Sequence, residues 1–509
     1  MHPEPSRTRS GVVVPTRTDP FARAASTSSG GPLGHRALTG HSWWSPLRIV
    51  LAVATVVFGL GVVQKSPCVV TDWEDAAQPL PFSHMCYSDI SYLYVGRGLA
   101  EGVLPYQPVE SLPDVKQPVE AEDAHQYSIE YPVLTGVWMG ATGFATRLIG
   151  RAPDVSDRTH DEVASDVDVQ FDGTLFWGVN AVGFFVVLLM ALTLLVYAQR
   201  RRPWDALFVA ASPALALTAM INWDLLVVGL VAGFLWAWST RRPLLAGVFI
   251  GLGTATKLFP LFFLGPLLVL CWRERMVDSW LRVSTGALAA WLAVNLPVYY
   301  WSPEEYLWFW RFNADRGPDF GSLWLVASDY GHSASPHVIN VSTAVLFGLA
   351  CLGVALLGLF ARRRPRLVQL LFLVVASFLL VNKVYSPQYV LWLLPLAALA
   401  RPRWRDLLIW QACEVFYFFA VWMHIGNFFV AEGANDWAYA LATLVRVAGL
   451  VFLMGVVVRD IVEPAADPVR RDGLSDDPLG GVLDRGIDAT KAPRRTRPGA
   501  GSAGGSSVS

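Results

Sequence analysis

One aspartate stands out in the first polar stretch of the chain. Asp89 lies in the nearly apolar, aromatic run Cys86–Arg97, about 25 residues after an apolar block at about 47–64. A carboxylate at such a membrane edge is costly unless it is paired or used. Residue chemistry alone leaves two interpretations open: Asp89 is a general base in a membrane-embedded cavity, or it caps a helix or pairs with Arg97.

A second acidic residue closes the same polar stretch, in the run Tyr127–Pro132. Pro132 holds the residue before it extended, and so fixes Glu130 and Tyr131 at the start of the next segment. Glu130 either binds a sugar hydroxyl or is a surface charge, and we favour the surface charge.

A lone lysine, Lys257, lies between two short apolar blocks in the run Ala255–Pro260. Its ammonium either snorkels to the membrane surface or binds a phosphate as a point charge. We favour phosphate binding, because Pro260 shapes a turn that presents the lysine.

A fourth polar motif, Asn382–Pro395, separates two apolar blocks and offers a cation, amide and hydroxyl groups, and two tyrosines. A loop that only connects two apolar helices does not need so many polar side chains. Arg311, Asn313 and His424 are candidates to complete a polar cavity around it.

Several kinds of site are not supported by the sequence. There is no Gly-rich phosphate loop, no HExxH and no nucleophile elbow, so ATP hydrolysis and a cytoplasmic nucleotide-sugar site have no basis. No basic stripe suggests nucleic acid. Cys68 and Cys86 have the wrong spacing for zinc, and we expect them to form a disulfide if their loop faces an oxidising compartment.

The elements that must position these residues are membrane helices. The chain is 53% hydrophobic and 16% charged, against about 25% charged residues in a soluble domain. Its apolar residues gather in blocks long enough to cross about 30 Å of hydrocarbon. We predict an all-α polytopic membrane protein with twelve spans: about 47–64, 174–199, 204–221, 225–240, 243–256, 258–272, 279–300, 338–361, 367–381, 388–400, 406–424 and 436–458.

Arginine clusters between the blocks set the predicted topology, because cytoplasmic loops are enriched in Lys and Arg. Both termini are then cytoplasmic, and the candidate site residues face outward. A thirteenth block, about 132–150, breaks this parity. It is interrupted by glycines, and the stretch after it, 151–172, holds seven carboxylates. We therefore expect 132–150 to dip into the membrane and return, or to lie at the interface.

The domain organisation follows from this topology. We predict disordered cytoplasmic tails at 1–45 and 461–509, because both are polar and rich in small residues. The transmembrane domain occupies 46–460. Its external loops are about 65–131, 151–172 and 301–337, with juxtamembrane helices in the first long loop and an aromatic surface helix in the last.

Taken in order, these motifs resemble those of polyprenol-phosphate-dependent glycosyltransferases of the GT-C fold. The chain is most similar to glycosyltransferase family 87, an actinobacterial alpha-mannosyltransferase family formerly grouped as a domain of unknown function. The matching elements are Asp89 with Tyr92, Tyr94 and Gly96; Gly102–Tyr106; Tyr131-Pro132, without a second Pro; Lys257–Pro260; and Ser386–Pro395.

The resemblance implies a membrane enzyme of the plasma membrane that acts on its outer face. A hexose, mannose by resemblance, moves from a polyprenyl-phosphate donor to a cell-envelope glycolipid or polysaccharide, with inversion. Asp89 is the implied general base. Lys257, with Lys383 or Arg311, is expected to bind the donor phosphate, and Glu130, Tyr131, Tyr92, Gln388, Tyr385 and His424 are assigned to sugar or acceptor binding.

The implied mechanism needs no cofactor and no divalent metal, because side-chain cations can meet the departing phosphate. The expected partners are the lipid-linked donor, the acceptor, membrane lipid and cell-wall assembly proteins. Two other classes compete: a flippase or transporter for lipid-linked glycans, and a non-catalytic scaffold for cell-wall assembly. A transporter would place charged residues at mid-span and repeat its helix pattern in two halves.

Overall fold

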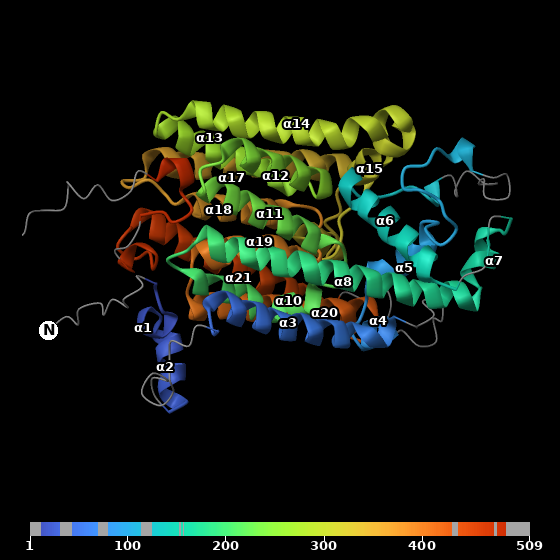
Figure 1. Ribbon diagram of the computed structural model, residues 1–509, viewed down its shortest axis with the longest axis horizontal. Helices are drawn as coiled ribbons and strands as arrows, with labels where there is room; N and C mark the ends of the chain where they lie inside the picture. The colour runs from blue at the N-terminus through green and yellow to red at the C-terminus, as the bar shows by residue number, and fades with distance from the viewer. Residues whose placement is uncertain are drawn as a thin grey trace, which may run out of the picture.

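The computed structural model describes residues 12–30, 43–69, 80–112, 125–151, 154–155, 157–429, 436–472 and 476–484. These residues form helices and connecting loops, with no strand among them, so the predicted all-α fold is confirmed. Most helices of the bundle lie along its long axis (Figure 1).

Six helices of the described chain are long and apolar enough to cross a membrane. They are α3 (Pro46–Lys65, continued by η2, Ser66–Cys68), α8 (Val167–Ala198), α14 (Val277–Trp301), α17 (Pro336–Phe360), α20 (Trp404–Ile425) and α21 (Trp437–Val462). Side-chain caps begin several of them, as when Ser45 accepts from Arg48 N and Asp436 accepts from Ala438 N. The chain is a multi-pass membrane protein.

Shorter apolar helices fill the interior of the bundle. They are α11 (Asp224–Ser239), α12 (Pro243–Thr256), η7 with α13 (Phe259–Phe263 and Leu264–Arg273), α18 (Leu367–Val381), and η8 with α19 (Pro387–Tyr389 and Val390–Ala400). α12 packs closely on α14, because Gly247 and Gly251 leave no side chain between the two backbones. A Cβ at Gly247 would lie 2.0 Å from the Val283 carbonyl oxygen.

The predicted span at about 204–221 is wrong as a single helix. Three short pieces take its place: η6 (Pro203–Ala206), α9 (Leu207–Ala210) and α10 (Pro213–Thr218). Ser212 caps α10 and Pro213 occupies its first turn, where a proline starts a helix readily but cannot continue one.

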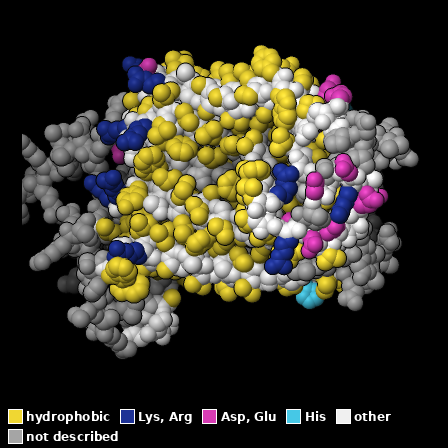
Figure 2. Space-filling view, turned by 45° about the vertical axis from the view of Figure 1, so that its right-hand side comes forward, with side chains coloured by type: hydrophobic (Ala, Val, Ile, Leu, Met, Phe, Trp, Pro, Cys, Tyr) yellow, Lys and Arg dark blue, Asp and Glu magenta, His cyan; other side chains and the backbone are white. Residues whose placement is uncertain are grey.

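The two ends of the bundle differ in charge. One end, which we call the acidic end, carries α4 (Leu80–Ser83), α5 (Asp89–Gly96), η3 (Val109–Ser111), α6 (Val133–Ile149), α7 (His160–Ala164), α15 (Pro303–Asp315) and α16 (Leu323–Asp329). Figure 2 shows Asp and Glu gathered at this end, on the right, and clusters of Lys and Arg at the opposite end, the arginine end.

The block at about 132–150 forms one continuous helix, α6, which lies at the acidic end (Figure 1). It is not among the helices with the length and composition of a span. Thr135 Oγ1 donates to the Thr256 carbonyl oxygen, 2.8 Å away, so α6 is fixed against the end of α12. α6 does not dip and return within its own length.

The predicted disorder of both tails is wrong where the structure describes them. α1 (Pro15–Thr18) and α2 (Pro20–Ser28) lie at the arginine end of the bundle (Figure 1). Asp19 Oδ2 accepts a hydrogen bond from Trp404 N there, at 3.2 Å. The described residues 463–472 and 476–484, which we call the C-terminal segment and which include η9 (Arg470–Asp472) and η10 (Gly481–Leu483), pack on the same end.

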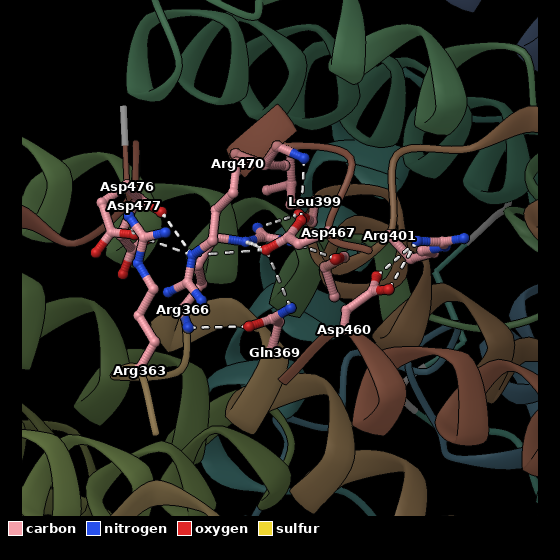
Figure 3. Close-up of polar contacts among 12 residues, drawn as sticks. Arg363, Arg366, Gln369, Leu399, Arg401, Asp460, Asp467, Arg470, Asp476 and Asp477 are labelled. Carbon is pink, nitrogen blue, oxygen red and sulfur yellow. Dashed lines mark hydrogen bonds and ion pairs between the residues drawn. The ribbon is translucent and has the colours of Figure 1, made fainter. Parts of the chain in front are cut away.

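Buried ion pairs fasten this C-terminal segment, as Figure 3 shows. Arg366 Nε lies 2.8 Å from Asp467 Oδ2. Arg401 Nη1 lies 2.7 Å from Asp460 Oδ2 on α21 and also donates to the Ala466 carbonyl oxygen of the segment at 3.3 Å. Composition alone predicts a solvated tail, but these arginines are buried at the arginine end and need carboxylates to neutralise them. The remainder of both tails lies outside the described residues.

Candidate active site

Asp89 is the first residue of α5, and three contacts place it. Its backbone N donates to the Ile221 carbonyl oxygen at 2.8 Å, and Ser88 Oγ donates to the Met220 carbonyl oxygen at 2.7 Å. A disulfide joins Cys68 to Cys86 just upstream. Ser88, not Asp89, is the N-cap, so the cap interpretation of Asp89 is wrong.

The half-buried Asp89 carboxylate accepts two hydrogen bonds. Tyr87 Oη donates to Oδ1 at 2.6 Å, and Asn222 Nδ2 donates to Oδ2 at 2.7 Å. Burial raises the pKa of Asp89 above its ordinary value, while these two hydrogen bonds oppose the rise. A carboxylate whose pKa is raised in this way is a better proton acceptor than a solvated one.

Lys257 lies at the end of α12, where the backbone turns extended before η7. Its side chain is 8% exposed, and its Nζ lies 3.5 Å from Asp224 Oδ1 and 5.0 Å from the centre of the Tyr131 ring. Asp224 is the fully buried first residue of α11, and its Oδ1 also accepts from Trp392 Nε1 at 2.7 Å.

Tyr131 connects the carboxylate to the cation. Its hydroxyl accepts from Asn222 Nδ2 at 2.9 Å, and the same amide donates to Asp89. Its ring lies under Lys257. We call Asp89, Tyr131, Asn222, Asp224 and Lys257 the acid–lysine cluster. The cluster brings together the predicted base and the predicted phosphate-binding lysine, which are 168 positions apart in the chain.

An aromatic pocket adjoins the acid–lysine cluster between α6, α12, α14 and α15. Tyr131 belongs to both the cluster and the pocket, and Leu258 next to Lys257 also lines the pocket. The other walls include Thr254, Trp291, Asn295, Tyr306 and Trp310. The pocket therefore places aromatic and apolar side chains next to the acid–lysine cluster.

The 382–389 loop contributes differently from its prediction. Tyr385 is buried, and its hydroxyl donates to Glu414 Oε1 at 3.0 Å, while the Arg446 guanidinium lies 3.4 Å from its ring centre. The polar group of Tyr385 is thus used inside the bundle, and its assignment to sugar binding stays a prediction. Gln388 is also buried, and its Oε1 has no hydrogen-bond partner among the described residues.

The two other predicted phosphate ligands have contacts of their own. Lys383 Nζ donates to the Arg316 carbonyl oxygen at 2.7 Å, and burial, followed by the nearby Arg316 charge, lowers the pKa of Lys383. Arg311 is exposed on α15 and lies 3.4 Å from the exposed Glu304. Neither of these contacts is with a member of the acid–lysine cluster. Of the three predicted phosphate ligands, Lys257 is the one that belongs to the cluster.

Three predicted acceptor-binding residues lie outside the acid–lysine cluster. Glu130 forms an ion pair with Arg97, which gives Arg97 a partner other than Asp89. Tyr92 is 52% exposed on α5. His424 Nδ1 lies 2.8 Å from Asp436 Oδ2, and its ring stacks on Tyr439 at 4.0 Å, so His424 belongs to a separate group at the ends of α20 and α21.

Sequence reasoning missed Asn222, Asp224 and Trp392 as members of the site. The signal for Asp224 was present, because a carboxylate directly before the apolar run 225–239 is as costly as Asp89 unless it is paired. Lys65 was missed as well. This buried cation at the end of α3 donates to the Met85 carbonyl oxygen at 3.0 Å. In the described part of the chain, no three His, Cys, Asp or Glu side chains are grouped to hold a metal ion, and independence from metal stays a prediction.

The fold and the cluster together define a multi-pass membrane protein with a carboxylate–lysine site at one end of its helical bundle. Residues 167–382 match the family model of glycosyltransferase family 87, and this match supports membership of the chain in that family. The family indicates a membrane glycosyltransferase. The matched segment contains Asn222, Asp224 and Lys257, while Asp89 and Tyr131 lie before it. No curated protein matches the chain.

Proposed function

We propose that the protein transfers a hexose, mannose by the family resemblance, from a polyprenyl phosphate to a cell-envelope glycolipid or glycan, with inversion at the anomeric carbon. One observation carries the proposal. The half-buried Asp89 carboxylate and the Lys257 ammonium belong to one cluster, joined by the hydrogen bonds of Asn222 to Asp89 and Tyr131 and by the Lys257–Tyr131 cation–π contact, and this cluster adjoins an aromatic pocket.

The reaction needs one proton acceptor and one cation. Asp89 takes the proton from an acceptor hydroxyl as that oxygen bonds to the anomeric carbon. The bond from the anomeric carbon to the phosphate oxygen breaks on the opposite face, and the electron pair leaves with the polyprenyl phosphate. The Lys257 ammonium stabilises the charge that develops on that phosphate.

The lengths of the helices support a lipid-linked donor. α11 has 16 residues and α12 has 14. At 1.5 Å per residue they span about 21–24 Å, less than the roughly 30 Å hydrocarbon core. Asp224 begins α11 and Lys257 follows α12, so both lie at the ends of helices that are shorter than the hydrocarbon core. In this proposal the phosphate of a membrane lipid reaches Lys257 from the side.

Charge supports the orientation. The arginine end faces the cytoplasm by the positive-inside rule, which puts both termini inside and the acid–lysine cluster on the outer face of the plasma membrane. In this proposal the chain crosses the membrane about twelve times, with the six long helices, the five shorter apolar ones and the broken segment 203–218 as the passes. An outward site fits a polyprenyl-phosphate donor and needs no nucleotide.

The test replaces Asp89 by Asn in a strain lacking the gene and compares envelope glycolipids by mass spectrometry. We expect the wild-type gene to restore one hexose to one glycolipid, and Asp89→Asn to leave that hexose missing while the protein is present in the membrane. Glu101→Gln is the matched control, because Glu101 is a buried carboxylate at the same end that bonds Tyr127 and His160 instead.

Restoration of the hexose by Asp89→Asn would contradict the assignment of the base. A glycolipid profile that is complete without the gene would point to the scaffold. Accumulation of an unmodified lipid-linked glycan on the inner face would point to the flippase.

A further inference from the structure

The turn between α10 and α11 lies between the base and the cation. It consists of Asn222, Trp223 and Asp224, and each of these side chains is at least nine-tenths buried. The central Trp223 is fully buried and donates from Nε1 to Asn180 Oδ1 on α8 at 3.0 Å. The turn is thus anchored to a long helix, independently of the two residues that it presents to the site.

Asn222 points toward the base. Its Nδ2 donates to Asp89 Oδ2 at 2.7 Å and to the Tyr131 hydroxyl at 2.9 Å, and its Oδ1 accepts from Trp223 N. Both N–H groups and the carbonyl oxygen of the amide are used, so its orientation is fixed. Each oxygen of the Asp89 carboxylate accepts one of the two hydrogen bonds from Tyr87 and Asn222, and a carboxylate oxygen has a second lone pair for a proton.

Asp224 points toward the cation. Its Oδ1 lies 3.5 Å from Lys257 Nζ and accepts from Trp392 Nε1. Its Oδ2 is buried and has no hydrogen-bond partner among the described residues. A fully buried carboxylate with one oxygen unsatisfied is costly, and its presence here is explained by the Lys257 ammonium that it holds in place.

We propose that the Asn222–Trp223–Asp224 turn is the positioning element of the transfer site, in which Asn222 orients the base Asp89 and Asp224 holds the phosphate-binding Lys257. The inference rests on the proposed function and deepens it. Asn222 and Asp224 act through Asp89 and Lys257, and neither needs to touch the reacting atoms.

The two residues have opposite effects on the base, which gives the inference a distinctive signature. Burial raises the pKa of Asp89 and the Tyr87 and Asn222 hydrogen bonds lower it; the Lys257 charge also lowers it, and the Asp224 charge raises it. Loss of the Asn222 hydrogen bond therefore raises this pKa, and loss of the Asp224 charge lowers it. The titratable and charged groups outside the cluster that interact with its members are Lys65, Tyr87, Glu130 and Tyr389, and Arg316 in turn lies near Tyr389.

The experiment uses the full chain in nanodiscs, with radiolabelled polyprenyl-phosphate mannose as donor and membranes from a deletion strain as the source of acceptor. Transfer is measured from about pH 3 to about pH 9, a range that brackets ordinary aspartate and histidine pKa values. Binding of undecaprenyl phosphate, a probe for the leaving group, is followed by tryptophan fluorescence.

We expect Asn222→Ala to move the acidic limb of kcat/KM to higher pH and to leave undecaprenyl phosphate binding unchanged. We expect Asp224→Asn to move the same limb to lower pH. It should also weaken undecaprenyl phosphate binding about tenfold or more, the size of one lost contact to a charged group. The matched controls are Gln411→Ala, a buried amide that bonds Ser212, and Asp460→Asn, a buried partner of Arg401; neither should move the limb or the binding.

Shifts in the same direction for the two variants, or undecaprenyl phosphate binding by Asp224→Asn as tight as that of the wild type, would overturn the inference. If Asp224→Asn does not fold, Trp392→Phe removes the hydrogen bond to Asp224 and keeps an aromatic ring. Weaker phosphate binding by this variant supports the inference, and unchanged binding contradicts it. Failure of the proposed function is distinguishable, because the wild-type protein would then leave the donor intact, or Asp89→Asn would transfer mannose at the wild-type rate, whatever the turn variants do.

Discussion

Removal of the Lys257 ammonium should damage stability and activity for separable reasons. Lys257→Met keeps most of the side-chain volume but leaves the buried Asp224 without its cation. Loss of one partner of a buried ion pair costs about 3–5 kcal/mol. Because Trp392 Nε1 still donates to Asp224 Oδ1, we expect the lower part of this range. Activity should fall about 10²–10³-fold, the usual effect of one lost contact to a developing anion.

A second substitution separates the two effects. Lys257→Met with Asp224→Asn removes both charges, so the thermal unfolding midpoint should return toward that of the wild type. Transfer should stay low, because no ammonium meets the departing phosphate. The assay combines tryptophan-monitored unfolding of the detergent-solubilised protein with mannose transfer to deletion-strain membranes. A double variant that recovers transfer together with stability would refute the phosphate role of Lys257.

Three further predictions follow from other parts of the structure. Burial raises the pKa of Asp89, and its ionised carboxylate is the form that accepts a proton. We therefore expect kcat/KM to fall as the pH decreases through a value higher than the pKa of an ordinary aspartate. A pH profile that is flat down to about pH 4, near the unperturbed pKa of about 3.9, would contradict this. Cys68→Ser with Cys86→Ser should lower the thermal midpoint and weaken transfer, because the disulfide anchors the segment just before Asp89 to α3; equal midpoints with and without the disulfide would argue against that role. Arg366→Met leaves Asp467 buried without its closest cation. This substitution should lower the free energy of unfolding by about 3–5 kcal/mol and leave the pH profile of kcat/KM unchanged. A thermal unfolding midpoint equal to that of the wild type would show that the C-terminal segment does not stabilise the bundle.

A charged residue at a membrane edge is costly unless it is paired or has a function. On this ground Asp89 and Lys257 could be selected from the sequence as candidate site residues. It did not say which partner each would have. Asp89 lies with Asn222 rather than Arg97, and Lys257 lies with Asp224. Both partners come from one turn that is remote from Asp89 in the chain, and hydropathy carries no information about such pairings.

Interior polar contacts were the least predictable part. Arg446 and Glu414 lie within apolar spans, 2.8 Å apart, and Arg446 supports the 382–389 loop through the Tyr385 and Ser386 carbonyl oxygens. Mean hydropathy over a window of residues does not reveal one buried ion pair such as Arg446–Glu414. Tyr385 was therefore assigned to sugar binding although its hydroxyl donates to Glu414. The prediction of a disordered C-terminal tail was wrong for a related reason. Composition cannot show that buried arginines at the arginine end require Asp467 and Asp477 as partners.

The most direct test of the account is transfer by the purified protein itself. Full-length protein in nanodiscs is given radiolabelled polyprenyl-phosphate mannose and a lipid extract from the deletion strain, and the labelled products are separated. We predict that label moves to one envelope glycolipid as polyprenyl phosphate is released, and that Asp89→Asn binds the donor but transfers about 10²–10⁴-fold more slowly. Donor that stays intact with the wild-type protein, or an Asp89→Asn variant that transfers at the wild-type rate, would contradict a sugar-transfer site built on Asp89 and Lys257.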